Sequence, residues 1–276
     1  MMLGPLDFKT FCTRLKILAG PFIFERSLKV DPQGVNTDRC LMTWPRESLG
    51  AGASAKYLRL LEDMGFADAA VASLDERQRQ ARFIHFGFEG SATVPVMKAY
   101  LEFEPDPAPG SLRYLAVKSA ANPAANAFVF SEYRQHAYQT RDQRRLDALS
   151  GPVPPSMHAL EAELVEIFWV DPALCDVLQV RDLGTSRVSF DWNTARAAVS
   201  PSTQAALLDA ARAFFEQHQS PQASATALAG VGVLNHIALG LSRTEQPFLT
   251  LYHDAEEWGD IHEFTDHRFG RAGLAE

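Results

Sequence analysis

The sequence predicts an α+β fold: a closed antiparallel barrel of ten β-strands with a solvent-filled lumen, ringed by α-helices. Segments that alternate apolar and polar residues recur in pairs around short polar turns, which is typical of antiparallel hairpins. The face opposite the apolar one carries small, charged and phenolic side chains, so it is too polar for a dry core. Closing the sheet gives that face a lumen and leaves no unpaired edge strand. An open α+β sheet with one solvated face is the alternative that the same pattern allows.

The clearest hairpin spans residues 231–254 around the turn S-R-T-E-Q-P. In its first strand Ile237 and Leu239 lie on the apolar face, whereas His236 and Ala238 lie on the other. In its second strand Tyr252 lies on the polar face. We expect this polar face to line the lumen.

Four more hairpins and several helices complete the expected barrel. The strands are 22–30 with 35–44, 82–89 with 94–104, 112–118 with 127–133, and 177–182 with 187–192. Helices are expected at 53–70, 141–149, 157–169 and 201–217, with Ser200 as the N-cap of the last. Hairpin connections pair neighbouring strands antiparallel, so a parallel doubly wound sheet is excluded.

The composition fits one globular domain spanning residues 1–276, with 46% hydrophobic and 22% charged residues. The net charge of -8 without a basic block argues against nucleic acid as the main partner. No run approaches the ~18 apolar residues of a membrane span, so no membrane partner is expected. Three cysteines without a C-x-x-C motif fit a reducing, cytoplasmic setting.

Cationic and phenolic side chains gather on the inferred lumen face. They are Lys29, Arg39, Lys98, Tyr100, Arg187 and Tyr252. Converging Lys, Arg and Tyr donors suit a diphosphate, which needs both charge neutralisation and several hydrogen bonds. For each residue alone, a solvated strand charge is the simpler interpretation. The set on one face is what indicates an anion site.

Three stretches resemble the cyanobactin-type peptide prenyltransferases, a branch of the ABBA prenyltransferases. F-E-R-S-L-K-V at 24–30, followed by Arg39, is similar to the first hairpin of that family. M-K-A-Y-L-E-F at 97–103 resembles the strand with a diphosphate-binding lysine. G-L-S-R-T-E-Q-P-F-L-T-L-Y-H at 240–253 resembles the last hairpin. The resemblance covers most of the chain, from about residue 22 to 264.

The resemblance implies an isoprenyl (dimethylallyl or geranyl) diphosphate in the lumen, usually with Mg²⁺, and a ribosomally made, macrocyclic peptide as acceptor. It implies that Glu25 is the base that takes the acceptor's proton. Arg39, Lys98 and Lys29 would hold the leaving diphosphate. Tyr100 and Tyr252 would offer π faces to the allyl cation and exclude water. No metal ligands are expected from the protein, because its histidines lack metal-ligand spacing.

Two further features bear on the substrates. Ala238 stands where relatives carry bulky aromatic residues, so it leaves room for a second isoprene unit. Asp191 and Glu102 place negative charge in the lumen, which would pair with a guanidinium or polarise an indole or imidazole N–H. This ranks an arginine acceptor slightly ahead of tryptophan, tyrosine and histidine. Asp191 could instead pair with Arg187, two residues away. Two other functions fit the pattern: an ABBA transferase acting on a small aromatic molecule, and a non-catalytic barrel that binds an apolar or anionic ligand.

Overall fold

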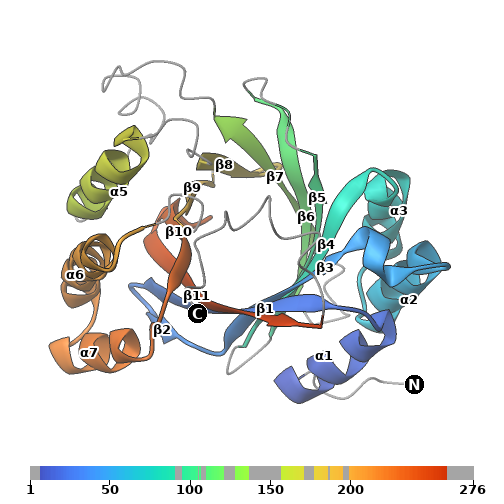
Figure 1. The fold of residues 1–276 in the computed structure, drawn as a ribbon, viewed down its shortest axis with the longest axis horizontal. Coiled ribbons are helices and arrows are strands. Elements are labelled where there is room, and N and C mark those ends of the chain that lie inside the picture. Colours follow the sequence, from blue (N-terminus) through green and yellow to red (C-terminus); the bar gives the residue numbers. More distant parts are fainter. Residues whose placement is uncertain are drawn as a thin grey trace.

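The computed structural model describes residues 7–90, 95–104, 106, 110–120, 128–136, 157–170, 177–185, 187–194 and 199–259. Its strands are β1 (Phe22–Asp31), β2 (Gly34–Asn36), β3 (Arg39–Pro45), β4 (Ala81–Glu89), β5 (Val96–Phe103), β6 (Leu112–Ala120), β7 (Phe128–His136), β8 (Val177–Asp182), β9 (Val188–Asn193), β10 (Leu234–Leu241) and β11 (Pro247–Trp258). Each strand pairs antiparallel with its neighbours, and β11 returns to pair with β1 (Figure 1). The predicted closed ten-stranded barrel is confirmed, with β2 as a short addition on β1.

The expected single strand 35–44 is divided between β2 and β3. These two strands pair with successive stretches of β1. The side chain of Asn36 accepts a hydrogen bond from the backbone N–H of Asp38 at 3.0 Å. Such a local turn competes with the strand ladder and interrupts it. As a result β3 begins at Arg39, which is the first residue of this strand to face the lumen.

The helices cover the barrel in two groups on opposite sides (Figure 1). One group is α1 (Phe8–Leu15), α2 (Ala53–Asp63) and α3 (Asp68–Gln78), with the short η1 (Lys16–Leu18) and η2 (Arg46–Leu49); the other is α5 (His158–Val170), α6 (Pro201–His218) and α7 (Pro221–Ala229). The helices expected at 157–169 and 201–217 are confirmed, and Ser200 accepts from the Thr203 N–H at 3.2 Å. The helix expected at 141–149 lies outside the described residues.

The expected helix 53–70 is two helices rather than one. It ends at Asp63, and Gly65 follows with a φ of 80°, a left-handed conformation that glycine adopts without strain. The chain then turns into α3, which begins at Asp68. The apolar stripe of the first helix extends across this turn and does not show where the turn occurs.

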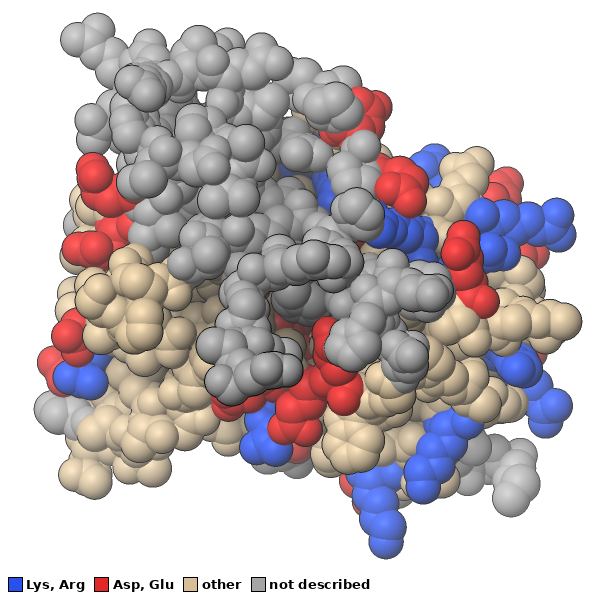
Figure 2. Space-filling model, in the orientation of Figure 1, with Lys and Arg blue, Asp and Glu red and all other residues tan. Residues whose placement is uncertain are grey.

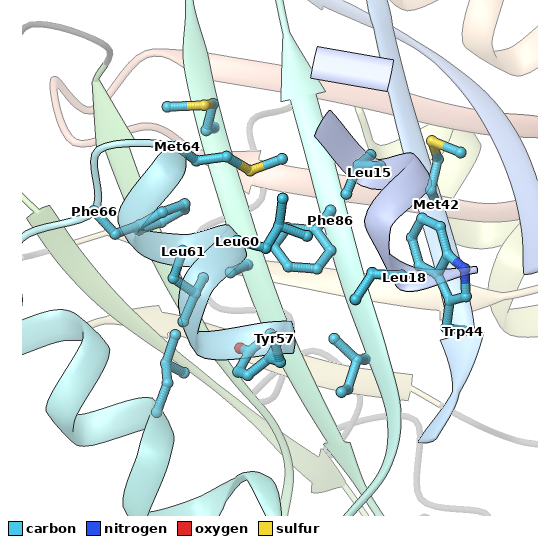
Figure 3. Close-up of a cluster of buried hydrophobic side chains, with 14 of the residues drawn as sticks. Leu15, Leu18, Met42, Trp44, Tyr57, Leu60, Leu61, Met64, Phe66 and Phe86 are labelled. Atoms are coloured by element: carbon cyan, nitrogen blue, oxygen red, sulfur yellow. The ribbon is translucent and has the colours of Figure 1, made fainter. Parts of the chain in front are cut away.

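The outer wall of the barrel is packed under these two groups of helices. Tyr57, Leu60 and Leu61 of α2 belong to the cluster that covers β3 and β4, where the rings of Tyr57 and Phe86 are 5.7 Å apart (Figure 3). A second cluster joins α5, α6 and α7 to β8–β11. Apolar side chains therefore leave the strands outward, and the alternate residues are left to line the lumen.

No helix in the described part of the chain is both long enough and apolar enough to cross a membrane.

Candidate active site

Two cavities lie inside the barrel and share part of their walls. The larger has a volume of about 410 Å³, and we call it the cationic chamber because its lining includes Lys29, Arg39, Lys98, Lys118, Arg187 and Arg243. The smaller, of about 50 Å³, is lined by Glu25, Asp191 and His236 among others, and we call it the acidic chamber. Tyr100, Tyr133, Asp191 and Tyr252 line both. The two chambers therefore meet at a boundary made of three phenol rings and one carboxylate.

Charge is distributed differently inside and outside the barrel. On the described part of the face in Figure 2, basic and acidic side chains are interspersed. Inside, six Lys or Arg side chains and the three carboxylates of Glu89, Asp182 and Asp191 line the cationic chamber, a formal charge of +3 when every Lys and Arg is protonated. Burial and the neighbouring Arg187 lower the pKa of Lys118 well below its usual range, so a bound anion would favour its protonated form. A positive cavity with low-dielectric walls attracts and concentrates a multivalent anion.

Glu89 holds two of these cations in place. Its carboxylate lies 2.6 Å from the Arg39 guanidinium and 2.7 Å from the Lys98 ammonium. Burial lowers the pKa of Lys98 to about 8, against the opposing effect of Glu89. Arg39 is 8% exposed, and its Nε also donates to the Ser27 hydroxyl at 3.4 Å. Gly87 lies beside them, where a Cβ would come within 3.4 Å of the Lys98 side chain.

Asp182 organises three more cations. Its carboxylate, which is fully buried, accepts from Lys118 at 3.0 Å, Arg187 at 2.9 Å and Arg243 at 2.9 Å. Burial opposes ionisation, but Lys118 and Arg187 outweigh it and hold the pKa of Asp182 well below its usual range. This one carboxylate links β6, β8, the start of β9 and the β10–β11 turn, so the cations are positioned before any ligand arrives.

The tyrosines at the boundary are neutral and close to one another. The rings of Tyr100 and Tyr133 are 6.0 Å apart, and Tyr114 lies 5.6 Å from Tyr133. Burial raises the pKa values of Tyr100, Tyr133 and Tyr252, so each keeps its hydroxyl proton. Neutral phenols offer π faces to a cation and hydroxyl donors to an anion.

The acidic chamber contains a histidine placed between two carboxylates. His236 Nε2 lies 3.1 Å from Glu25, and His236 Nδ1 lies 2.8 Å from Asp191. Burial opposes its protonation, but Asp191 and Glu25 outweigh that effect and raise the pKa of His236 to about 10. The imidazole ring stacks on Tyr252 at 3.8 Å with 8° between the planes.

A second histidine lies in the wall of the same chamber. His85 Nδ1 lies 2.8 Å from the Thr43 hydroxyl, and His85 Nε2 lies 3.0 Å from Glu102. Glu102 is in turn 3.8 Å from Arg113, and its side chain is 3% exposed. Glu102 lies beside His85 and lines neither of the two chambers, whereas His85 lines the acidic one.

The alternation of strand residues placed most of the candidate side chains correctly inside the barrel. The cationic chamber is lined by Lys29, Arg39, Lys98, Tyr100, Arg187, Asp191, Ala238 and Tyr252, and the acidic chamber by Glu25. The suggested pairing of Asp191 with Arg187 is wrong: Arg187 pairs with Asp182, and Asp191 pairs with His236. The reason is that Asp182 reaches three cations at once from β8.

Sequence reasoning missed several residues of the two chambers, namely Glu89, Lys118, Tyr133, Asp182, His236 and Arg243. Lys118 and Tyr133 alternate with outward-facing residues, so the same period-two pattern would have found them. Arg243 lies in a turn, where no periodicity applies. His236 lies on the predicted polar face, but strand alternation alone does not show that both of its ring nitrogens meet carboxylates.

Prenyltransferases are among the solved structures that this chain resembles. 5-Dimethylallyltryptophan synthase from Streptomyces coelicolor matches with a TM-score of 0.57 and 16% identity over 84% of this chain and 80% of that one. The same enzyme in complex with DMASPP and Trp matches equally well, over 78% of its length. The NotF prenyltransferase matches with a TM-score of 0.51 and 10% identity over 84% of this chain and 80% of its own. The chain therefore has the ABBA barrel fold. No protein-family model and no curated protein sequence matches it.

Proposed function

We propose that this protein is a prenyltransferase, which moves an isoprenyl group from an allyl diphosphate in the cationic chamber to an acceptor in the acidic chamber. The observation that carries the proposal is the shared boundary: Tyr100, Tyr133 and Tyr252 separate a cavity rich in Lys and Arg from one lined by Glu25, Asp191 and His236. The barrel fold, found in solved prenyltransferases, supports the same function.

The cationic chamber is suited to the departure of diphosphate. As the C–O bond of the donor breaks, negative charge builds on the leaving group, and the Arg39, Lys98 and Lys118 donors are already in place to stabilise it. The positive charge left on the allyl carbon faces neutral tyrosine rings instead of water. The new bond forms across the boundary, and the acceptor's proton passes to the Glu25 carboxylate.

The lining of the acidic chamber favours an aromatic acceptor. The chamber is lined by four tyrosines and two histidines, which offer flat surfaces against which a ring can stack. The Streptomyces enzyme of the same fold has been solved in complex with DMASPP and Trp. The arginine acceptor expected from the sequence is the second candidate, because Glu25 and Asp191 both face the chamber. His236 already carries a positive charge between these two carboxylates, which weakens their attraction for a guanidinium.

The protein's own donors are poorly suited to hold Mg²⁺. This ion prefers carboxylate and water oxygens in octahedral geometry. Glu89 and Asp182, two of the carboxylates in the cationic chamber, are each occupied by Lys or Arg. The described residues contain no group of three or more His, Cys, Asp or Glu placed to bind a metal. We therefore propose that these cations, rather than a protein-held Mg²⁺, neutralise the diphosphate.

The direct test is mass spectrometry of candidate acceptors incubated with dimethylallyl or geranyl diphosphate. Free tryptophan and peptides that contain Trp, Tyr, His or Arg would be compared, each with Mg²⁺ and with EDTA. We expect an isoprenyl adduct on an aromatic acceptor and retention of activity in EDTA. An adduct on arginine alone would favour the peptide alternative, and complete loss in EDTA would contradict the cation-only site. Donor binding without any adduct would indicate a ligand-binding barrel.

Donor length should respond to Ala238, which is 9% exposed and lines the cationic chamber next to Asp191 and Thr250. Ala238→Phe should shift the preference from geranyl to dimethylallyl diphosphate, because overpacking a filled pocket costs about 1–3 kcal/mol. The ratio of kcat/KM for the two donors measures this. Ala225→Phe, a change at an exposed position of α7 outside the barrel, is the matched control. An unchanged donor ratio in Ala238→Phe would contradict the pocket assignment.

A further inference from the structure

The contacts of the His236 imidazole indicate its protonation state, whether or not a substrate is bound. Both of its ring nitrogens lie within hydrogen-bond distance of a carboxylate, Glu25 at 3.1 Å and Asp191 at 2.8 Å. When both carboxylates are ionised they only accept hydrogen bonds, and both nitrogens then carry a proton. The ring is then an imidazolium, a cation that the chain itself supplies between two acids. Charge-assisted hydrogen bonds of this kind are roughly twice as strong as neutral ones.

The same ring joins strands that close the barrel. His236 lies on β10, Asp191 on the neighbouring β9, and Glu25 on β1, two strands away in the other direction. The strand between β10 and β1 is β11, and its Tyr252 lies directly opposite His236 in the β10–β11 pairing. The imidazole stacks on the Tyr252 ring at 3.8 Å. Its Nε2 reaches past β11 to the Glu25 carboxylate on β1. One side chain thus fixes the proposed base and one ring of the chamber boundary.

We propose that His236 is a positioning residue: its imidazolium keeps Glu25 ionised and orients both Glu25 and Tyr252 at the junction of the two chambers. The inference about catalysis rests on the proposed function, whereas the inference about the imidazolium does not. Removing the cation would leave two buried carboxylates facing the same space. Burial and mutual repulsion would then favour protonation of one of them, which removes the base at a higher pH than in the parent protein.

The other groups that face His236 do not replace its charge. Tyr252 of β11 contacts it directly, and His85, Tyr114 and Tyr133 lie in the opposite wall of the chamber, on β4, β6 and β7. Burial raises the pKa values of Tyr133 and Tyr252, so these phenols stay neutral. His85 contacts Glu102 and Thr43 instead of Glu25 or Asp191. His236 is therefore the cation in direct contact with both carboxylates.

The first experiment measures the charge of His236 without any substrate. The protein, which contains 8 histidines, would be labelled with ¹⁵N-histidine, and the His236 signals assigned by their absence in His236→Gln. Because the pKa of His236 is raised to about 10, we expect its signals to remain those of an imidazolium from pH 5 to about 9. Titration near the ordinary pKa of about 6.5 would overturn the proposal.

The second experiment measures the pH dependence of prenyl transfer. In His236→Gln we expect the acid limb of the kcat profile to move to higher pH by about one unit or more, with partial recovery above it and little change in KM for the donor. In Asp191→Asn, which keeps the His236–Glu25 pair, the acid limb should not move upward. An equal loss at every pH in both variants would mean a structural role and overturn the positioning role. If the wild-type chain transfers no prenyl group, the proposed function fails, and the ¹⁵N titration still decides whether the imidazolium exists.

Discussion

Glu25→Gln should slow isoprenyl transfer roughly 10² to 10⁴-fold while leaving donor affinity unchanged. Glu25 is 5% exposed and lines the acidic chamber, away from the cations that hold the diphosphate. Glutamine keeps the shape of the side chain, and its carbonyl can still accept from His236 Nε2. What the change removes is basicity. Single-turnover transfer and donor binding, measured separately, would show whether chemistry alone is affected.

The matched control is Glu256→Gln on β11, whose side chain is 47% exposed and lies 3.8 Å from Arg26 outside the chambers. It makes the same chemical change and should leave transfer within about twofold. If Glu25→Gln is as fast as the parent, Glu25 serves only to hold His236. If it binds the donor weakly, the division between the two chambers is wrong.

The lumen face could be predicted because the strand period is two and hairpins fix which residues lie opposite each other. In the β4–β5 hairpin, Lys98 and Tyr100 lie on one face and Met97 and Ala99 on the other. The first pair lines the cationic chamber, and the second is buried under the helices. Local alternation therefore carries most of the information about which residues meet in the lumen.

The partners of those residues could not be predicted in the same way. The Glu25–His236 contact joins positions 211 residues apart, and it depends on how β11 returns to β1. Alternation places both side chains inside the barrel but does not give their height along its axis. Asp182 is a similar case, because its three cations come from β6, the residue before β9 and the β10–β11 turn. Glu102 shows that an inward-facing residue need not line a cavity. Its carboxylate contacts His85, and it lines neither chamber.

The positions where a strand or helix is interrupted also could not be predicted. Asn36 ends β2 through a side-chain turn, and Gly65 separates two helices that share an apolar stripe. Both are short polar or glycine signals inside longer periodic patterns. Only the break at Asn36 affects the site, because it sets the start of β3 at Arg39.

The second large effect is expected from the two cations on Glu89. Arg39→Ala and Lys98→Ala should each lower kcat/KM on the order of 10²-fold or more, about 3 kcal/mol of transition-state stabilisation. Each change removes a buried donor that lies within 2.7 Å of Glu89 in the cationic chamber. Each also leaves the Glu89 charge less compensated, so that it repels the diphosphate. Steady-state kinetics with varied donor and saturating acceptor measures the loss.

Coupling between the two residues gives a sharper test of the shared site. Because Arg39 and Lys98 both pair with Glu89, the double variant should lose less than the product of the two single losses. Arg59→Ala on α2, whose side chain is 72% exposed, is the control for removing one positive charge and should change kcat/KM by less than about twofold. Near-normal turnover in both single variants would contradict the assignment of the cationic chamber to the diphosphate. Independent, fully multiplicative losses would place Arg39 and Lys98 in separate sites rather than around one leaving group.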